Sequence, residues 1–149
     1  MDWMSLFQNR MLLSSLYSWA AAQILKTIIY WITNKKLDLH RIVGDGGMPS
    51  GHSATVTALA TTAAIEYGLD SPVFAIAAIL AIVVMHDAMG VRLEAGKHAK
   101  IINEMNEFMH RMVNDDIKVK TKLKEFVGHT PLQVFFGAIL GLVMAIILG

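Results

Sequence analysis

GGMPSGHSA, residues 46–54, is the stretch around which we expect the chain to be organised. Two glycines and a proline shape a turn, and a serine, a glycine and a histidine follow where a helix of small apolar residues begins. The start of a helix presents unpaired backbone N–H groups and the positive end of the helix dipole, which suits phosphate and other oxyanions. His52 adds an imidazole that can exchange a proton near neutral pH. The stretch therefore predicts an anion site with a titratable group beside it.

The composition indicates a membrane protein. The chain has 149 residues, a length for one domain that we expect to span residues 1–149, and 54% of them are hydrophobic against 17% charged. The net charge of +1 gives no reason to expect a nucleic-acid partner. The absence of cysteine excludes disulfides, thiolate zinc sites and cysteine nucleophiles. The apolar residues gather in long runs, as they do in membrane-spanning segments.

Four apolar segments are separated by polar ones, and we expect each to cross the membrane as a helix. They cover about residues 11–33, 53–67, 72–88 and 132–149. The last contains Gly137 and Gly141, a small-xxx-small pattern that lets helices approach closely. Apolar residues at helical spacing from Ile101 to Met112 predict an amphipathic helix that lies on the membrane or caps the bundle. The expected fold is an all-α integral membrane bundle of about four transmembrane helices plus a cytoplasmic amphipathic helix.

Lysine and arginine are unevenly distributed between the polar segments. The first polar loop contains Lys35, Lys36 and Arg41, the second contains eight such residues from Arg92 to Lys124, and Arg10 alone lies on the other side. By the positive-inside rule both polar loops are cytoplasmic and both termini face outward. The glycine-rich turn and the segment from Arg92 to His98 then share one membrane face and can form one site.

The polar side chains that this topology brings to the cytoplasmic side are of the kinds used in phosphoryl transfer. They are Lys26, His52, His86, Asp87, Arg92, Glu94, Lys97, His98 and His129. Cationic side chains and helix-start N–H groups neutralise phosphate oxygens. Of two histidines, one can attack phosphorus and the other protonate the leaving oxygen. Glu94 lies four residues before His98 on the same helical face, where it can hold the imidazole by a hydrogen bond.

Structural roles stay open for several of these side chains. Asp87 could pair with Lys26 or Arg92 instead of acting as a base. His98 could be a surface histidine of the amphipathic helix. His129 could belong to a turn before the last helix or line the site.

These motifs resemble the type 2 phosphatidic acid phosphatase superfamily, which includes lipid phosphatases and vanadium haloperoxidases. PSGH at 49–52 matches its second signature, and Arg92 followed by five residues and His98 matches the centre of its third. Lys26 takes the lysine position of the first signature. The wider pattern, GGMPS at 46–50, HDA at 86–88 and GHTP at 128–131, resembles the divergent bacterial and plastid branch and covers almost the whole chain.

The resemblance implies roles for individual residues. His98 would be the nucleophile that forms a phosphohistidine, and His52 would be the acid that protonates the leaving alcohol. The phosphate would be held by Lys26, Ser50, the N–H group of Gly51 and Arg92. The resemblance implies neither a metal nor another cofactor.

The chain also departs from the superfamily pattern. Val91 stands where the third signature has serine, Ile102 stands where it has the aspartate that orients the nucleophile, and the first signature lacks its Arg-Pro. The candidates to replace that aspartate are Glu94, which has the best helical phase, Asp87 and Asn103, and those to replace the arginine are Lys35, Lys36 and Arg41. The usual superfamily core has more spanning helices than this chain, so the fold is either a trimmed core or a homodimer.

We therefore expect a lipid phosphate phosphatase of the cell membrane. It would hydrolyse a phosphomonoester or pyrophosphate of a membrane lipid at the cytoplasmic surface, without metal, through a phosphohistidine. Its partners would be the lipid substrate and the bilayer. The alternative is a non-catalytic membrane protein that binds or scaffolds lipid phosphates. A transporter using Lys26 and Asp87 as pathway residues is a third interpretation, but the sequence shows no internal repeats.

Overall fold

The computed structural model of the chain describes residues 3–35, 46–112, 122–124 and 128–148. The helices are η1 (Trp3–Gln8, a 3₁₀ helix), α1 (Arg10–Asn34), α2 (Gly51–Tyr67), α3 (Pro72–Met89), α4 (Val91–Met112) and α5 (Pro131–Leu148). The described ranges contain no strand. The predicted all-α class is confirmed.

Local capping groups determine where the helices begin. Ser50 caps α2, because its Oγ accepts a hydrogen bond from the Ser53 N–H at 3.3 Å. Ser71 caps α3 in the same way, directly before Pro72 at the first helical position. Helix α5 begins with a capping box, in which the Thr130 N–H donates to Gln133 Oε1 at 3.1 Å and the Gln133 N–H donates to Thr130 Oγ1 at 3.4 Å. Each of the four predicted apolar segments corresponds to one of the helices α1, α2, α3 and α5.

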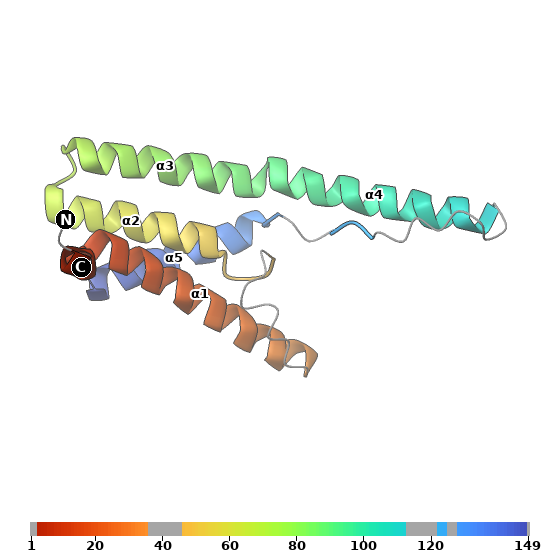
Figure 1. The fold of residues 1–149 in the computed structure, drawn as a ribbon, viewed down its shortest axis with the longest axis horizontal. Coiled ribbons are helices and arrows are strands. Elements are labelled where there is room, and N and C mark those ends of the chain that lie inside the picture. Colours follow the sequence, from red (N-terminus) through yellow and green to blue (C-terminus); the bar gives the residue numbers. More distant parts are fainter. Residues whose placement is uncertain (1–2, 36–45, 113–121, 125–127, 149) are drawn as a thin grey trace.

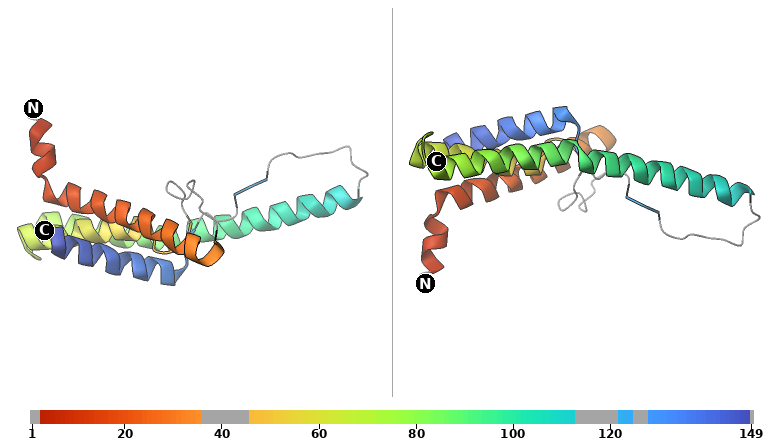
Figure 2. Two further views of the ribbon diagram at one scale, coloured as in Figure 1. Left: turned by 90° about the horizontal axis from the view of Figure 1, so that it is seen from below. Right: turned by 90° about the horizontal axis from the view of Figure 1, so that it is seen from above.

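Helices α1, α2, α3 and α5 form a bundle, and α2 is in contact with the other three (Figure 1). Helix η1 and the end of α5 lie at one end of the bundle, and the start of α2 lies toward the other. Helix α4 continues α3 beyond the bundle, as the two views in Figure 2 show. Among the described helices α4 contacts only α3. It therefore does not cap the bundle, which was one of the two positions expected for it.

Small and polar side chains fill the interior of the bundle, and large apolar side chains cover its outside. The largest fully buried side chains are Thr62, Ser14, Ser18, Ser50 and Ser53. The buried hydrophobic residues are alanines apart from Val56 and Val134, whereas isoleucine, leucine and phenylalanine side chains are exposed along the helices. A soluble protein buries such large apolar side chains, whereas helices surrounded by lipid pack through small ones. The chain is thus a membrane-type helical bundle.

In the described part of the chain, two helices are long and apolar enough to cross a membrane. One is the continuous helix from Pro72 to Met109, whose apolar part is α3, and the other is α5. Only 17% and 22% of their most apolar windows are buried within the chain, so neither resembles the core helix of a soluble protein. Helix α1 carries buried Gln23 and Lys26, and α2 has 17 residues. The count of four spans stays a prediction.

Two glycines allow α5 to lie directly against α2. A Cβ at Gly137 would overlap the carbonyl oxygen of Ser50 and lie 2.9 Å from the Cβ of Ser53. A Cβ at Gly141 would overlap the carbonyl oxygen of Ala54. The small-xxx-small packing face predicted for the last helix is confirmed, and it places the start of α5 beside the start of α2.

Candidate functional site

The candidate site lies where α2 and α5 begin. The Ser50 N–H donates to the carbonyl oxygen of Gln133 at 3.0 Å, which ties the two helix starts together. Ser50 is fully buried, and its Oγ also accepts from Ser53 Oγ at 3.0 Å. The positive dipole ends of two helices therefore lie side by side, an arrangement that favours an anion.

Lys26 brings a positive charge to these helix starts from within the bundle. Its side chain is only 3% exposed, and Nζ donates to Gln23 Oε1 at 2.9 Å. Gln23 lies against the first residue of α2, because a Cβ at Gly51 would be 3.6 Å from Gln23 Nε2. Lysine is almost never buried so fully without an anionic or polar partner. The predicted lysine of the anion site is thus directed inward, toward the start of α2.

His52 faces His129 across the site. Their ring centroids are 5.8 Å apart with an interplanar angle of 62°, an edge-to-face contact. His129 is 2% exposed, and its backbone N–H donates to the carbonyl oxygen of Ala88 at 3.0 Å. Its Nδ1 lies 3.2 Å from Gln133 Oε1. The start of α2 and the segment that leads into α5 therefore contribute one imidazole each.

His98 lies elsewhere, on an exposed part of α4. Leu93, Gly96, Lys97 and Lys100 form the face of α4 that turns toward the glycine-rich turn. At about 100° per residue, His98 points roughly 140° around the helix from Leu93. The structure therefore does not bring His98 together with His52.

Glu94, the residue expected to orient His98, is engaged with a lysine. Lys97 Nζ donates to Glu94 Oε1 at 2.6 Å, and both side chains are exposed. This hydrogen bond, together with the positive charge of Lys97, lowers the pKa of Glu94 below its ordinary value.

Arg92 and Asp87 pair with each other across the joint between α3 and α4. Arg92 Nε donates to Asp87 Oδ2 at 2.7 Å, and the two side chains are 43% and 41% exposed. This matches one of the structural alternatives left open for Asp87. Arg41, a candidate to replace the first-signature arginine, lies outside the described residues.

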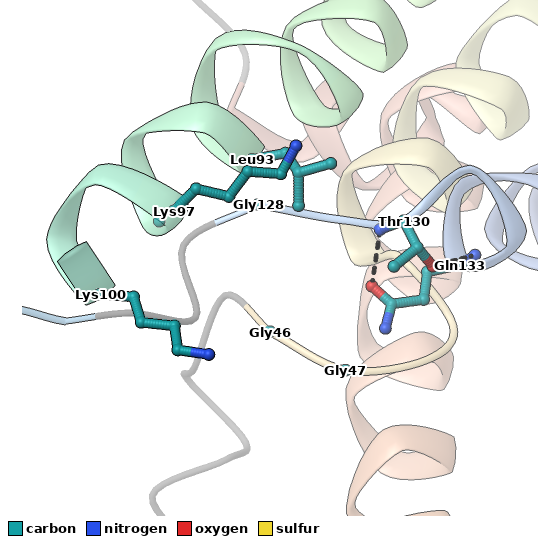
Figure 3. Close-up of a pocket in the computed structure, with 9 residues that line it drawn as sticks. Gly46, Gly47, Leu93, Lys97, Lys100, Gly128, Thr130 and Gln133 are labelled. Carbon is teal, nitrogen blue, oxygen red and sulfur yellow. Dashed lines mark hydrogen bonds between the residues drawn. The ribbon is translucent and has the colours of Figure 1, made fainter. Parts of the chain in front are cut away.

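A cavity of about 420 Å³ lies beside the glycine-rich turn (Figure 3). Its walls are the glycine-rich turn, one face of α4 and the segment that leads into α5, through Gly46, Gly47, Leu93, Gly96, Lys97, Lys100, Gly128, Thr130 and Gln133. Gly128 passes so close to α4 that a Cβ would overlap the backbone of Leu93. The side chain of Lys100 extends toward Gly46. Gln133 connects the cavity to the histidine pair, because it lines the cavity and contacts His129.

Gln133 and Lys100 are functional candidates that were not predicted from the sequence. Two sequence patterns could have identified Gln133: the T-x-x-Q pattern of a capping box that begins at Thr130, and the spacing of four residues from His129. No sequence pattern identifies Lys100, since its role depends on which face of α4 turns toward the bundle.

Comparison with known sequences places the chain in a family. Residues 7–144 match the family described as Divergent PAP2. The chain belongs to the Divergent PAP2 family. The resemblance inferred from the PSGH motif and the arginine–histidine spacing is thereby confirmed at the level of this branch.

One relative supports the membrane assignment of this Divergent PAP2 protein. Over 153 residues the chain is 44% identical to an uncharacterized membrane protein of Bacillus subtilis (strain 168), YuiD, and the alignment covers 97% of each chain. No solved structure matches the chain.

Proposed function

We propose that this Divergent PAP2 protein is a lipid phosphate phosphatase, which hydrolyses a phosphomonoester or pyrophosphate of a membrane lipid. The observation that carries the proposal is the buried positive site formed by Lys26 and the paired starts of α2 and α5, with His52 beside it. A lysine within membrane helices costs about 2.5–3.5 kcal/mol on insertion scales, so such residues usually have a function. Membership of the family supports chemistry related to that of the phosphatases.

The phosphate would bind to the first N–H groups of α2, including that of Gly51, and to the ammonium of Lys26. Ser50 would contribute by holding this turn in place, because its hydroxyl already accepts from Ser53. Arg92 would add positive charge at the rim, where its ion pair with Asp87 is partly exposed.

Two hollows that the glycine-rich turn borders suit the two parts of a lipid phosphate. The cavity that Lys97 and Lys100 line would receive an anionic headgroup. An apolar groove of about 280 Å³ between α1 and α5 would receive a hydrocarbon chain, and its walls are Leu25, Ile29, Met48, Pro49, Phe136, Ile139, Leu140 and Val143. Because Met48 and Pro49 directly precede Ser50, a lipid in this groove would carry its phosphate to the start of α2.

The proposed reaction proceeds in two steps. A histidine attacks phosphorus, the bond from phosphorus to the lipid oxygen breaks, and the His52 imidazolium gives its proton to that oxygen. Water then attacks the phosphohistidine, neutral His52 accepts a proton from it, and phosphate leaves as the histidine is regenerated. The superfamily pattern alone would assign the attack to His98, but the exposed position of His98 on α4 does not support that role. These steps need no metal ion.

We further propose that the protein crosses the cell membrane several times, with this site on the cytoplasmic side and both termini outside. The distribution of lysine and arginine supports that orientation. The bundle supports placing both termini on the side opposite the site, since η1 and the end of α5 lie at one end and the start of α2 lies toward the other.

Phosphate release from a panel of lipids tests the function. Purified protein in detergent and a metal chelator should release phosphate from a lipid phosphomonoester or pyrophosphate but not from a phosphodiester lipid. Lys26→Met should reduce release roughly a hundredfold or more, because it removes a cationic ligand. Lys122→Met, at an exposed position, is the matched control and should leave release unchanged. Binding of lipid phosphate without release from any of the panel would favour the alternative, a protein that only binds such lipids.

A further inference from the structure

We infer that His129, rather than His98, is the histidine that attacks phosphorus, and that Gln133 orients it. This assignment rests on the proposed phosphatase function and names a catalytic residue for it. Its starting point is distance, because the rings of His52 and His129 are in contact with centroids 5.8 Å apart. A two-histidine mechanism requires both imidazoles to reach one phosphoryl group.

The position of His98 does not meet that requirement. Helix α4 contacts only α3 among the described helices, and His98 is exposed on it. The face of α4 that borders the cavity contains Leu93 and Lys97, roughly 140° and 100° around the helix from His98. Four residues after His98, Ile102 has no side-chain group that accepts a hydrogen bond.

The same spacing of four residues places an acceptor beside His129. Gln133 Oε1 accepts the N–H of Thr130 at 3.1 Å, which identifies this atom as the amide oxygen. His129 Nδ1 lies 3.2 Å from the same oxygen and is therefore its donor. In the neutral imidazole the lone pair is then on Nε2, the atom that attacks. Gln133 thus takes the orienting part that the missing aspartate has in the superfamily signature.

The chemistry then runs between residues at two adjoining helix starts. The Nε2 lone pair of His129 forms the bond to phosphorus, the ester oxygen departs, and it receives the proton of the His52 imidazolium. For an in-line displacement the attacking and leaving atoms lie on opposite sides of phosphorus, so the two rings must separate to admit the phosphoryl group. The backbone N–H bond from His129 to Ala88 and the contact of its Nδ1 with Gln133 hold the His129 ring in place during the attack.

Trapping the phosphohistidine identifies the nucleophile. The full-length His52→Asn variant is incubated with p-nitrophenyl phosphate, whose leaving group needs no proton, so that attack occurs while hydrolysis of the intermediate is slowed. After an alkaline quench, mass spectrometry should find phosphate on the peptide that contains His129. The label should persist when His98→Asn is added and disappear when His129→Asn is added. Phosphate on His98 would overturn the assignment.

Steady-state phosphate release separates the two ways in which the assignment can fail. We expect His129→Asn to lower release from the lipid substrate roughly a thousandfold or more, and His98→Asn to leave it near the wild-type rate. If the wild type is active and His98→Asn abolishes release while His129→Asn does not, the assignment is wrong and the proposed function stands. If the wild type releases no phosphate and the His52→Asn variant does not become labelled, the assignment and the proposed function are both wrong.

Gln133 variants test the orienting role without altering either histidine. Gln133→Glu keeps the acceptor and the capping box, so release should be maintained. Gln133→Leu removes both, and we expect kcat to fall roughly tenfold or more with little change in KM. A purely structural role for Gln133 would instead lower the unfolding midpoint with kcat per folded molecule unchanged, and that result would contradict the orienting role.

Discussion

Replacing Gly141 with alanine should loosen α5 from α2 and destabilise the bundle. The added Cβ would overlap the carbonyl oxygen of Ala54 and lie 3.0 Å from the nitrogen of Ala58. These are backbone atoms of a neighbouring helix, so no side chain can rotate to relieve the overlap. The two helices would have to move apart along the contact that also joins Ser50 to Gln133.

The expected cost follows from two opposing effects. Forcing an extra methyl group into a packed interior costs about 1–3 kcal/mol. The higher helix propensity of alanine returns up to about 1 kcal/mol. Because Ala54 and Ala58 are fully buried and leave no space beside Gly141, the first effect should dominate, with a net loss of roughly 1–2 kcal/mol.

Unfolding by denaturant in detergent micelles, followed by tryptophan fluorescence, measures this loss. Gly51→Ala is the matched control, because its Cβ would lie 3.5 Å from Trp19 Cδ1, an ordinary contact. We expect the midpoint to fall for Gly141→Ala and to stay level or rise for Gly51→Ala. Equal midpoints for Gly141→Ala and the wild type would refute the close packing of α5 on α2.

Three further predictions concern single contacts. Lys26→Met removes a buried charge and also the 2.9 Å hydrogen bond to Gln23, so two opposing effects should leave the free energy of unfolding in the same assay within about 1 kcal/mol of the wild type; a loss of several kcal/mol would indicate that Lys26 mainly holds the helices together. Thr62→Val should cost about 1 kcal/mol through loss of the 2.8 Å hydrogen bond to Ser14, and adding Ser14→Ala should cost less than a second full increment; strictly additive costs would count against the bond. In an NMR titration the pKa of Glu94 should lie below its ordinary value and should return toward that value in the Lys97→Met variant. Because the lowered pKa favours the folded state, the stabilisation from Glu94 is present above the pKa of the unfolded state and is lost as the pH falls through the pKa of the folded state. An unshifted pKa of Glu94 in the wild type would contradict this prediction.

The helices could be predicted from the sequence because their signals are local. Long apolar runs predicted α3 and α5, and the serine, proline and glycine residues near the ends of these helices indicated where each begins and ends. The direction of α4 could not be predicted in this way. Its apolar stripe suits a helix on a membrane or on a protein, whereas its path depends on how Gly90 joins it to the end of α3.

The candidate site could be predicted only in part, because only some of its residues are brought together by local signals in the sequence. His52 and Ser50 lie together at one helix start, and Lys26 is close to them because α1 packs on α2. The choice between His98 and His129 depends instead on tertiary contacts far apart in the sequence. The rotation of α4 turns His98 away, and the bond from the His129 N–H to Ala88 holds His129 at the site.

The phosphate-binding role expected for Ser50 illustrates how one residue can satisfy two patterns. The PSGH motif predicted a hydroxyl that contacts phosphate, but the structure shows that hydroxyl accepting from Ser53 as a helix cap. Serine before a helix start is the usual capping residue, so this use was also readable from the sequence.

The rate of phosphate release from a lipid phosphomonoester, compared between the wild type and His52→Asn in the presence of a chelator, tests the proposed function most directly. We predict metal-independent release by the wild type and a rate about 10²–10⁴-fold lower for His52→Asn, because the leaving oxygen loses its proton donor. Equal rates for the two proteins, or no release by the wild type from any lipid phosphate, would contradict it.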